Sequence, residues 1–184
     1  FGLYFLIKQY CQYAVAKAMA AYHAQMPYSM VVLAGDNIYS NGILPDGDMR
    51  RIADVFEKPY QPLRQKGVKF HAVLGNHDII TKNGEPQLRY PGFNMNGQRY
   101  YTLQKNLVQF FALDLNPGKH LSAQRDWLQK QLGQSKALWK IVFSHFPIYS
   151  SGVYGVDLDL IREFATLFKK YGVQLYINGH YHNY

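Results

Sequence analysis

The sequence predicts a single α/β domain over residues 1–184, with much of its sheet parallel. Two observations predict this fold: short runs of consecutive apolar residues indicate buried strands, and segments of helical composition separate them. The chain is 48% hydrophobic and 17% charged, which excludes a disordered protein and suits one domain with a real core. Helices between apolar strands favour an α/β domain with parallel pairing.

Five of the expected strands contain apolar runs, and the segment 98–106 is expected to be a strand because it pairs with the one after it. The expected strands are residues 29–35, 68–75, 98–106, 107–115, 137–145 and 173–180. The third and fourth form a pair, because only Lys105 and Asn106 stand at the turn between them. Residues 76–97 form a long loop, and loops of that length are usually functional or mobile.

The helices follow from composition and from their start and stop signals. The expected helical segments are residues 8–25, 47–67, 122–135 and 157–172. Pro27 stops the first, and Pro59 and Pro62 interrupt the second. Ser122 is the expected N-cap of the third helix, and Gly172 ends the fourth.

Charge and composition narrow the classes of partner that the protein can have. The formal net charge is +8, but the basic residues are scattered and form no block typical of a nucleic-acid tail. A basic surface favours anionic substrates such as phosphates, although a merely solvated surface explains the charge equally well. The apolar start "FGLYFLI" is far shorter than a membrane span. We therefore expect neither a nucleic-acid nor a membrane partner.

Polar side chains gather where four of the apolar strands end. The clusters are "LAGDNIY", "VLGNHD", "IVFSHFP" and "YINGHYH", and they supply Asp36, Tyr39, Asn76, His77, His145, His180 and His182. Ligands of open α/β sheets bind beyond the carboxyl ends of the strands. Oxygen and imidazole groups without a thiolate suit Fe, Zn or Mn, and the set is too rich in nitrogen for Ca²⁺ or Mg²⁺. The only cysteine, Cys11, excludes a cysteine-only metal site.

The spacing indicates two metal ions. Asp36 has two oxygens and can bridge. His180 and His182 would point to opposite faces of an extended segment, so a shared role as ligands requires a turn. Two ions roughly 4 Å apart suit in-line displacement at phosphorus, where one binds a phosphate oxygen and the other makes hydroxide from water.

The blocks "GDNIY", "GNHD", "VFSH" and "GHYH" resemble, in order, four of the five signature blocks of the purple acid phosphatases. The resemblance runs from about Ala14 to His182 and is strongest to the small, tartrate-resistant type. These enzymes belong to the wider calcineurin-like metallophosphoesterases, so the resemblance implies their sandwich of αββα layers. Tyr39 favours a phosphatase, because related phosphodiesterases and nucleases usually carry another residue there.

The resemblance also implies a role for each residue. It makes Asp36 the bridge, Tyr39 and His182 ligands of Fe(III), and Asn76, His145 and His180 ligands of a divalent ion (Fe, Zn or Mn). A hard trivalent ion stabilises a phenolate that otherwise forms only near pH 10. His77 corresponds to the catalytic residue that contacts the phosphate or protonates the leaving group. Asp78 either orients His77 or caps a turn.

The sequence departs from the family pattern at one block. The family's first block, GDxG, supplies another ferric ligand, and "FGLYFLIKQYCQ" stands where it is expected. The family also continues past GHxH, so we expect the chain to be a fragment of the sandwich, incomplete at both ends. His23, His71 and His120 match no block and are expected to be structural or exposed. Asp114 is also expected to be structural or exposed, although it could instead support the ligands of the site.

Three functions are compatible with these features. The first is a dinuclear-metal hydrolase of small phosphate monoesters, an acid phosphatase weakened by the missing block. The second is a non-catalytic metal-binding remnant of such an enzyme. The third is a phosphodiesterase or nuclease of the same superfamily, against which Tyr39 and the scattered charge count. The family resemblance favours an extracytoplasmic or secreted location and says nothing of the oligomeric state.

Overall fold

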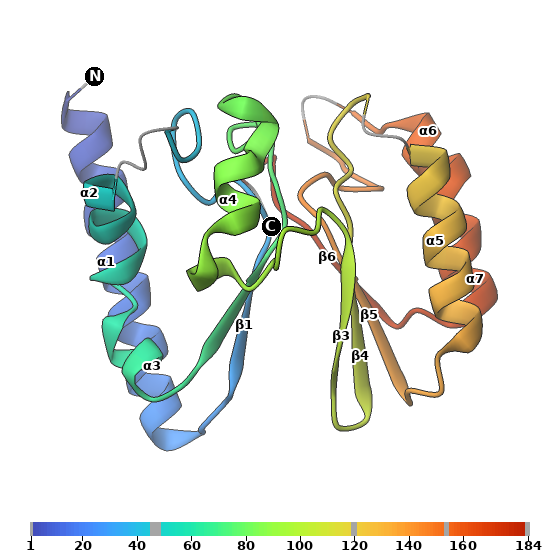
Figure 1. Cartoon of the computed structure of the whole chain (residues 1–184), viewed down its shortest axis with the longest axis horizontal. Helices are drawn as coiled ribbons and strands as arrows, with labels where there is room; N and C mark the ends of the chain where they lie inside the picture. The colour runs from blue at the N-terminus through green and yellow to red at the C-terminus, as the bar shows by residue number, and fades with distance from the viewer. Residues whose placement is uncertain (1, 45–48, 119–120, 153–154, 183–184) are drawn as a thin grey trace.

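The computed structural model describes residues 2–44, 49–118, 121–152 and 155–182. Two sheets lie at the centre, and helices cover the outer side of each, so the layers follow the order helix, sheet, sheet, helix (Figure 1). In the described part of the chain, no helix is both long and apolar enough to cross a membrane.

The first sheet has two described strands. Strands β1 (Met30–Leu33) and β2 (Lys69–Ala72) pair in parallel, with Met30 opposite Lys69. The helices on its outer side are α1 (Gly2–Gln25), α2 (Met49–Ile52), η1 (Ala53–Glu57) and α3 (Gln61–Gln65) (Figure 1).

The second sheet has the order β3-β4-β5-β6. Its strands are β3 (Tyr101–Lys105), β4 (Val108–Ala112), β5 (Trp139–Phe143) and β6 (Leu175–Ile177). Strands β3 and β4 pair antiparallel, and the two pairs that follow are parallel. The outer side is covered by α5 (Leu121–Gln134), α6 (Leu158–Leu160), η4 (Ile161–Ala165) and α7 (Thr166–Tyr171) (Figure 1).

Two clusters of buried side chains hold the layers together. One includes Phe70 of β2 with Tyr101 and Phe143 of the second sheet, so it fills the space between the sheets. The other includes Phe111 of β4 and Leu128 of α5, so it joins the second sheet to its helices. Burial of apolar area on this scale is the main favourable term in folding.

The expected elements are largely present, and three details differ. The first helix begins at Gly2 rather than at residue 8. Ser122 is not an N-cap, because α5 already includes Leu121, which packs against the second core. Residues 76–97 are not one loop: they contain η2 (Lys82–Gly84), α4 (Glu85–Arg89) and η3 (Pro91–Phe93), because Leu88 and Phe93 are drawn into the core between the sheets. Gly172 ends α7 in the left-handed conformation, as its position predicts.

Candidate metal centre

The candidate site lies beyond the carboxyl ends of β1, β2, β5 and β6. The loops that follow these strands bring together every residue that the sequence singled out: Asp36, Tyr39, Asn76, His77, His145, His180 and His182. The parallel pairing of β1 with β2 and of β5 with β6 places the four loops at one end of the sandwich.

The loop after β1 needs its glycine. Gly35 and Asp36 both have positive φ, 85° and 51°. A Cβ on Gly35 would lie 2.6 Å from Nδ1 of His145, so only glycine allows the loop and the His145 ring to approach this closely. Asp36 then reaches the next loop, because its Oδ1 accepts a hydrogen bond from the backbone N–H of His77 at 2.9 Å.

His145 is the centre of a first group of donor atoms. Its Nε2 lies 3.1 Å from Oδ1 of Asn76, 3.2 Å from Nδ1 of His180 and 3.4 Å from Oδ2 of Asp36. Its Nδ1 lies 2.8 Å from the carbonyl oxygen of Ala34, which can only accept, so Nδ1 carries the proton. Nε2 of the neutral ring therefore presents a lone pair to two oxygens and to Nδ1 of His180, which can donate to it when that nitrogen carries the proton.

The two oxygens and Nε2 of His145 repel one another unless a donor such as Nδ1–H of His180, or a metal ion, lies among them. Burial lowers the pKa of His145, whose side chain is 2% exposed, and also lowers the pKa of His180. A proton is therefore held poorly here near neutral pH, whereas neutral imidazole is the form that binds a metal. The backbone partner on Nδ1 is the usual arrangement behind a metal-binding histidine.

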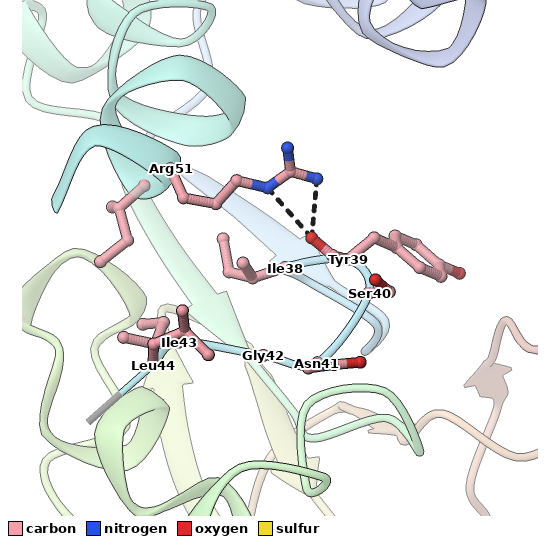
Figure 2. A pocket seen from close by; sticks show the side chains of 9 residues that line it. Ile38, Tyr39, Ser40, Asn41, Gly42, Ile43, Leu44 and Arg51 are labelled. Carbon is pink, nitrogen blue, oxygen red and sulfur yellow. Dashed lines mark hydrogen bonds between the residues drawn. The ribbon is translucent and has the colours of Figure 1, made fainter. Parts of the chain in front are cut away.

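Tyr39 belongs to a second group on the other side of Asp36. Its hydroxyl donates to Oδ2 of Asp36 at 2.9 Å and lies 3.2 Å from Nε2 of His182. Arg51 fixes the backbone at this point, because its Nε and Nη2 both donate to the carbonyl oxygen of Tyr39, at 3.0 and 2.7 Å (Figure 2). Figure 2 shows the Tyr39 ring directed away from the pocket that Ile38 and Arg51 help to line.

The loop after β6 contains the turn that two histidine ligands require. His180 and His182 both have positive φ, 76° and 54°, and the N–H of Tyr181 bonds to the carbonyl oxygen of Gly179. This turn sends His180 to His145 and His182 to Tyr39. Backbone conformations of this kind cost energy for residues other than glycine and cluster at functional sites.

His77 lies beside these two groups. Its ring packs 4.6 Å from the ring of Tyr39, and its Nδ1 lies 2.7 Å from the carbonyl oxygen of Ser40. Because that oxygen only accepts, Nδ1 carries a proton, and Nε2 is the nitrogen with which the ring can exchange one. The side chain is half-buried.

Asp78 locks the loops after β1 and β2 together. Its fully buried carboxylate accepts N–H bonds from Asn37 (backbone and side chain), Ile38, Gly75 and Gln87, at 2.9–3.2 Å. Burial raises its pKa to about 6, and the backbone N–H groups of Gly75, Asn37 and Ile38 oppose that rise. Of the two roles expected for Asp78, orienting His77 or capping a turn, this geometry matches the second. Asp78 caps its own turn and also the loop after β1.

The remaining candidates lie elsewhere. Asp114 is fully buried and bonds to Arg99 through Oδ2, at 2.9 Å, and to Asn116 through Oδ1, so neither of these partners is a candidate ligand. His23 is buried and His71 half-buried, and Nδ1 of each lacks a hydrogen-bond partner among the described residues. His120 lies outside the described residues.

The two groups need small adjustments to hold metal. Within the described ranges, no three His, Cys, Asp or Glu side chains form a ready metal site as they stand. Their donor atoms instead contact one another at 2.9–3.4 Å. Two ligands at about 2.1 Å from one ion, at right angles, stand roughly 3 Å apart, so the spacing already suits a shared ion.

Comparison with known proteins identifies the family. The profile described as "Calcineurin-like phosphoesterase" matches residues 9–184. The chain therefore belongs to the calcineurin-like phosphoesterase family, and the four-layer sandwich expected from its motifs is confirmed.

Among its relatives are acid phosphatases. Purple acid phosphatase 7 of Arabidopsis thaliana is 28% identical over 93% of this chain and 59% of its own length. Tartrate-resistant acid phosphatase type 5 of Homo sapiens is 28% identical over 92% of this chain and 60% of its own length. The chain thus spans about three fifths of these relatives, and the resemblance to purple acid phosphatases is confirmed.

Solved structures share the fold. GAP50, the anchor in the inner membrane complex of Plasmodium, superposes with a TM-score of 0.72 at 22% identity, covering 94% of this chain and 62% of its own. The purple acid phosphatase PPD1 from yellow lupin (Lupinus luteus) seeds gives 0.64 at 18% identity, covering 90% of this chain and 32% of its own.

Proposed function

We propose that this protein is a metal-dependent hydrolase of small phosphate monoesters, of the acid phosphatase type. The observation that carries the proposal is the cluster of acceptors around Nε2 of His145. The lone pair on Nε2 of His145 faces oxygens of Asn76 and Asp36. Burial lowers the pKa of His145, so this ring holds a second proton poorly. A cation among these atoms resolves the repulsion.

The donor atoms divide into two sets that share Asp36. Asn76, His145 and His180 complete the set that suits a divalent ion such as Fe, Zn or Mn. Tyr39 and His182 complete the set that we assign to Fe(III). Bound there, metal ions withdraw charge from a phosphate ester and make a coordinated water more acidic.

The chain's own groups prepare the site for that chemistry. The Ala34 carbonyl fixes the tautomer of His145, and the Asp78 carboxylate holds the loop of Asp36 against the loop of Asn76. His77 is the proton donor in this proposal. Its Nδ1 stays on Ser40, so the proton given to the leaving oxygen comes from Nε2.

The ferric set is the weaker of the two. It has three donors among the described residues, against four in the set for the divalent ion. Because this set has one donor fewer, we expect the 184-residue chain to bind Fe(III) less tightly than the divalent ion. This is the observation that favours the second candidate, a metal-binding protein without turnover.

Metal content and turnover, measured together, test the proposal. The purified 184-residue chain is assayed for bound metal, and for hydrolysis of 4-nitrophenyl phosphate and bis(4-nitrophenyl) phosphate. We expect bound metal and preference for the monoester, both lost in His145→Ala and retained in the matched control His71→Ala. Bound metal without turnover selects the non-catalytic candidate, preference for the diester selects a phosphodiesterase, and a folded chain without metal refutes both metal-dependent functions.

A further inference from the structure

The end of the sandwich opposite the candidate site has an unusual composition. Residues 25–30, 65–69, 104–109, 135–140 and 171–175 meet there, since they precede the parallel strands or form the β3–β4 turn (Figure 1). A shallow groove of about 830 Å³ runs between the two sheets at this end, lined by Met30 and Lys66 on one side and by Lys105, Leu107 and Trp139 on the other. We call this region the amino-end surface.

The amino-end surface exposes large apolar side chains. Those most exposed are Met26 (61%), Leu107 (63%), Leu138 (62%), Trp139 (51%) and Leu175 (49%). Four of them belong to segments that are bonded to one another: the N–H of Trp139 bonds to the carbonyl oxygen of Leu107, and Gln174, next to Leu175, bonds to that of Leu138. A contiguous exposed apolar patch of this kind marks an interaction site more often than scattered residues do.

The same surface is basic without any acidic residue. The five segments contain Lys66, Lys69, Lys105, Lys136 and Lys140, and all twelve Asp and Glu residues of the chain lie outside them. None of the ion pairs between described residues uses these lysines. Unlike the scattered charge of the whole sequence, the charge at this end is of one sign.

We propose that the amino-end surface docks on an anionic lipid bilayer. Leucine and tryptophan side chains at protruding turns enter the boundary between headgroups and acyl chains, and lysines around them pair with anionic headgroups. Tryptophan favours this depth because its ring is apolar and its N–H is polar. Peripheral docking needs no membrane-spanning helix. The sequence led us to expect no membrane partner only because it lacks a spanning segment, and the present proposal differs from that expectation.

The composition favours lipid over the other anionic partners. The five segments contain no arginine. Protein interfaces are enriched in arginine and depleted in lysine, and arginine makes the commonest specific contacts to nucleic acid. Lysine, a compact charge on a flexible stem, suits mobile lipid headgroups. The docked protein holds its candidate metal centre away from the bilayer, open to soluble substrates.

Vesicle binding tests the proposal on the 184-residue chain. Sedimentation with vesicles of phosphatidylcholine, with and without 30% phosphatidylserine, measures the partition coefficient. We expect binding only to the anionic vesicles, weakened by salt, with a blue shift of Trp139 fluorescence in the Trp127→Phe background. No binding to anionic vesicles, or no shift on binding, overturns the proposal.

Paired variants show whether this surface is responsible. Lys66→Gln with Lys105→Gln lowers the partition coefficient roughly fivefold per lysine, about 25-fold for the pair. Leu107→Asn with Leu138→Asn lowers it by roughly tenfold or more. The control, Lys17→Gln with Lys82→Gln, removes the same charge from exposed positions elsewhere and leaves binding nearly unchanged. Equal losses in the control, tighter binding to duplex DNA, or a dimer that Leu107→Asn dissociates each overturn the proposal.

Discussion

The substitution Asp78→Asn is expected to lower the metal affinity of the site much more than the stability of the fold. An asparagine presents one acceptor and one N–H₂ group where the carboxylate presents two acceptors. With its nitrogen at the Oδ1 position, the N–H groups of Ile38 and Gln87 lose their acceptor. With its nitrogen at the Oδ2 position, the N–H groups of Gly75 and the Asn37 side chain lose theirs. Two donors are unsatisfied in either orientation.

Two opposing terms set the net change in stability. Two buried donors without acceptors destabilise the fold by about 2–6 kcal/mol. The neutral amide, however, removes the penalty of burying a charge, which the rise of the Asp78 pKa from 3.8 to about 6 places at about 3 kcal/mol near pH 7. The difference runs from a gain of about 1 kcal/mol to a loss of about 3 kcal/mol, centred on a loss of about 1 kcal/mol, and stays below the about 5–15 kcal/mol that stabilises a typical domain. The variant therefore folds.

The effect on the metal centre is larger. In either orientation one lost hydrogen bond, from the Ile38 N–H or from the Asn37 side chain, joins the loop of Asp36 to the loop of Asn76. Removing a group that orients metal ligands typically lowers affinity about 10–100-fold. Calorimetric titration with Mn²⁺ or Zn²⁺ measures this affinity, and a thermal melt measures stability. We expect affinity to fall by that factor while Tm falls by only about 2–4 °C.

Asp114→Asn is the matched control, because Asp114 is also a fully buried carboxylate but bonds to Arg99 and Asn116 and to none of the candidate ligands. Breaking a buried ion pair destabilises by about 3–5 kcal/mol, with the lower end expected here since Arg99 is partly exposed. This variant should melt earlier than Asp78→Asn and bind metal normally below its Tm. Unchanged affinity in Asp78→Asn, or an equal loss in Asp114→Asn, refutes the reasoning.

Three further predictions address the metal centre itself. Asp36→Asn should abolish turnover and lower metal content, since a neutral amide cannot hold two cations together; near-normal hydrolysis of 4-nitrophenyl phosphate would contradict the shared carboxylate. Iron-loaded protein should show a phenolate-to-iron absorption band that Tyr39→Phe removes, and an unchanged visible spectrum would argue against Tyr39 as a ligand. His77→Ala should slow turnover about 10²–10⁴-fold while elemental analysis shows metal retained. Metal lost in step with activity would make His77 a ligand instead.

The sequence predicts the strands and the place of the site well, because both depend on local signals. Apolar runs mark five of the six described strands, all but β3, and side chains that follow parallel strands must meet at one end of the sheet. The turn at His180 and His182 was predictable too, since two neighbouring ligands cannot share a site in extended backbone.

Long-range partners account for what the sequence could not show. The carbonyl of Ala34 that orients His145 lies 111 positions away, and the Asn37 and Asp78 partners are 41 apart. The Arg51 contact to the Tyr39 carbonyl has no motif of its own, because any residue offers a carbonyl. Leu121 belongs to α5 through tertiary packing, which outweighs the preference of Ser122 for a cap.

The most direct measurement of the central claim is the metal content of the folded 184-residue chain, by elemental analysis after equilibration with Fe, Zn or Mn and removal of weakly bound ions. The cluster of Asp36, Asn76, His145 and His180 predicts at least one tightly held ion per chain, absent in His145→Ala and present in His71→Ala. A folded chain that retains no metal, or a His145→Ala variant that retains as much as the unaltered chain, would contradict the assignment of this cluster as a metal centre.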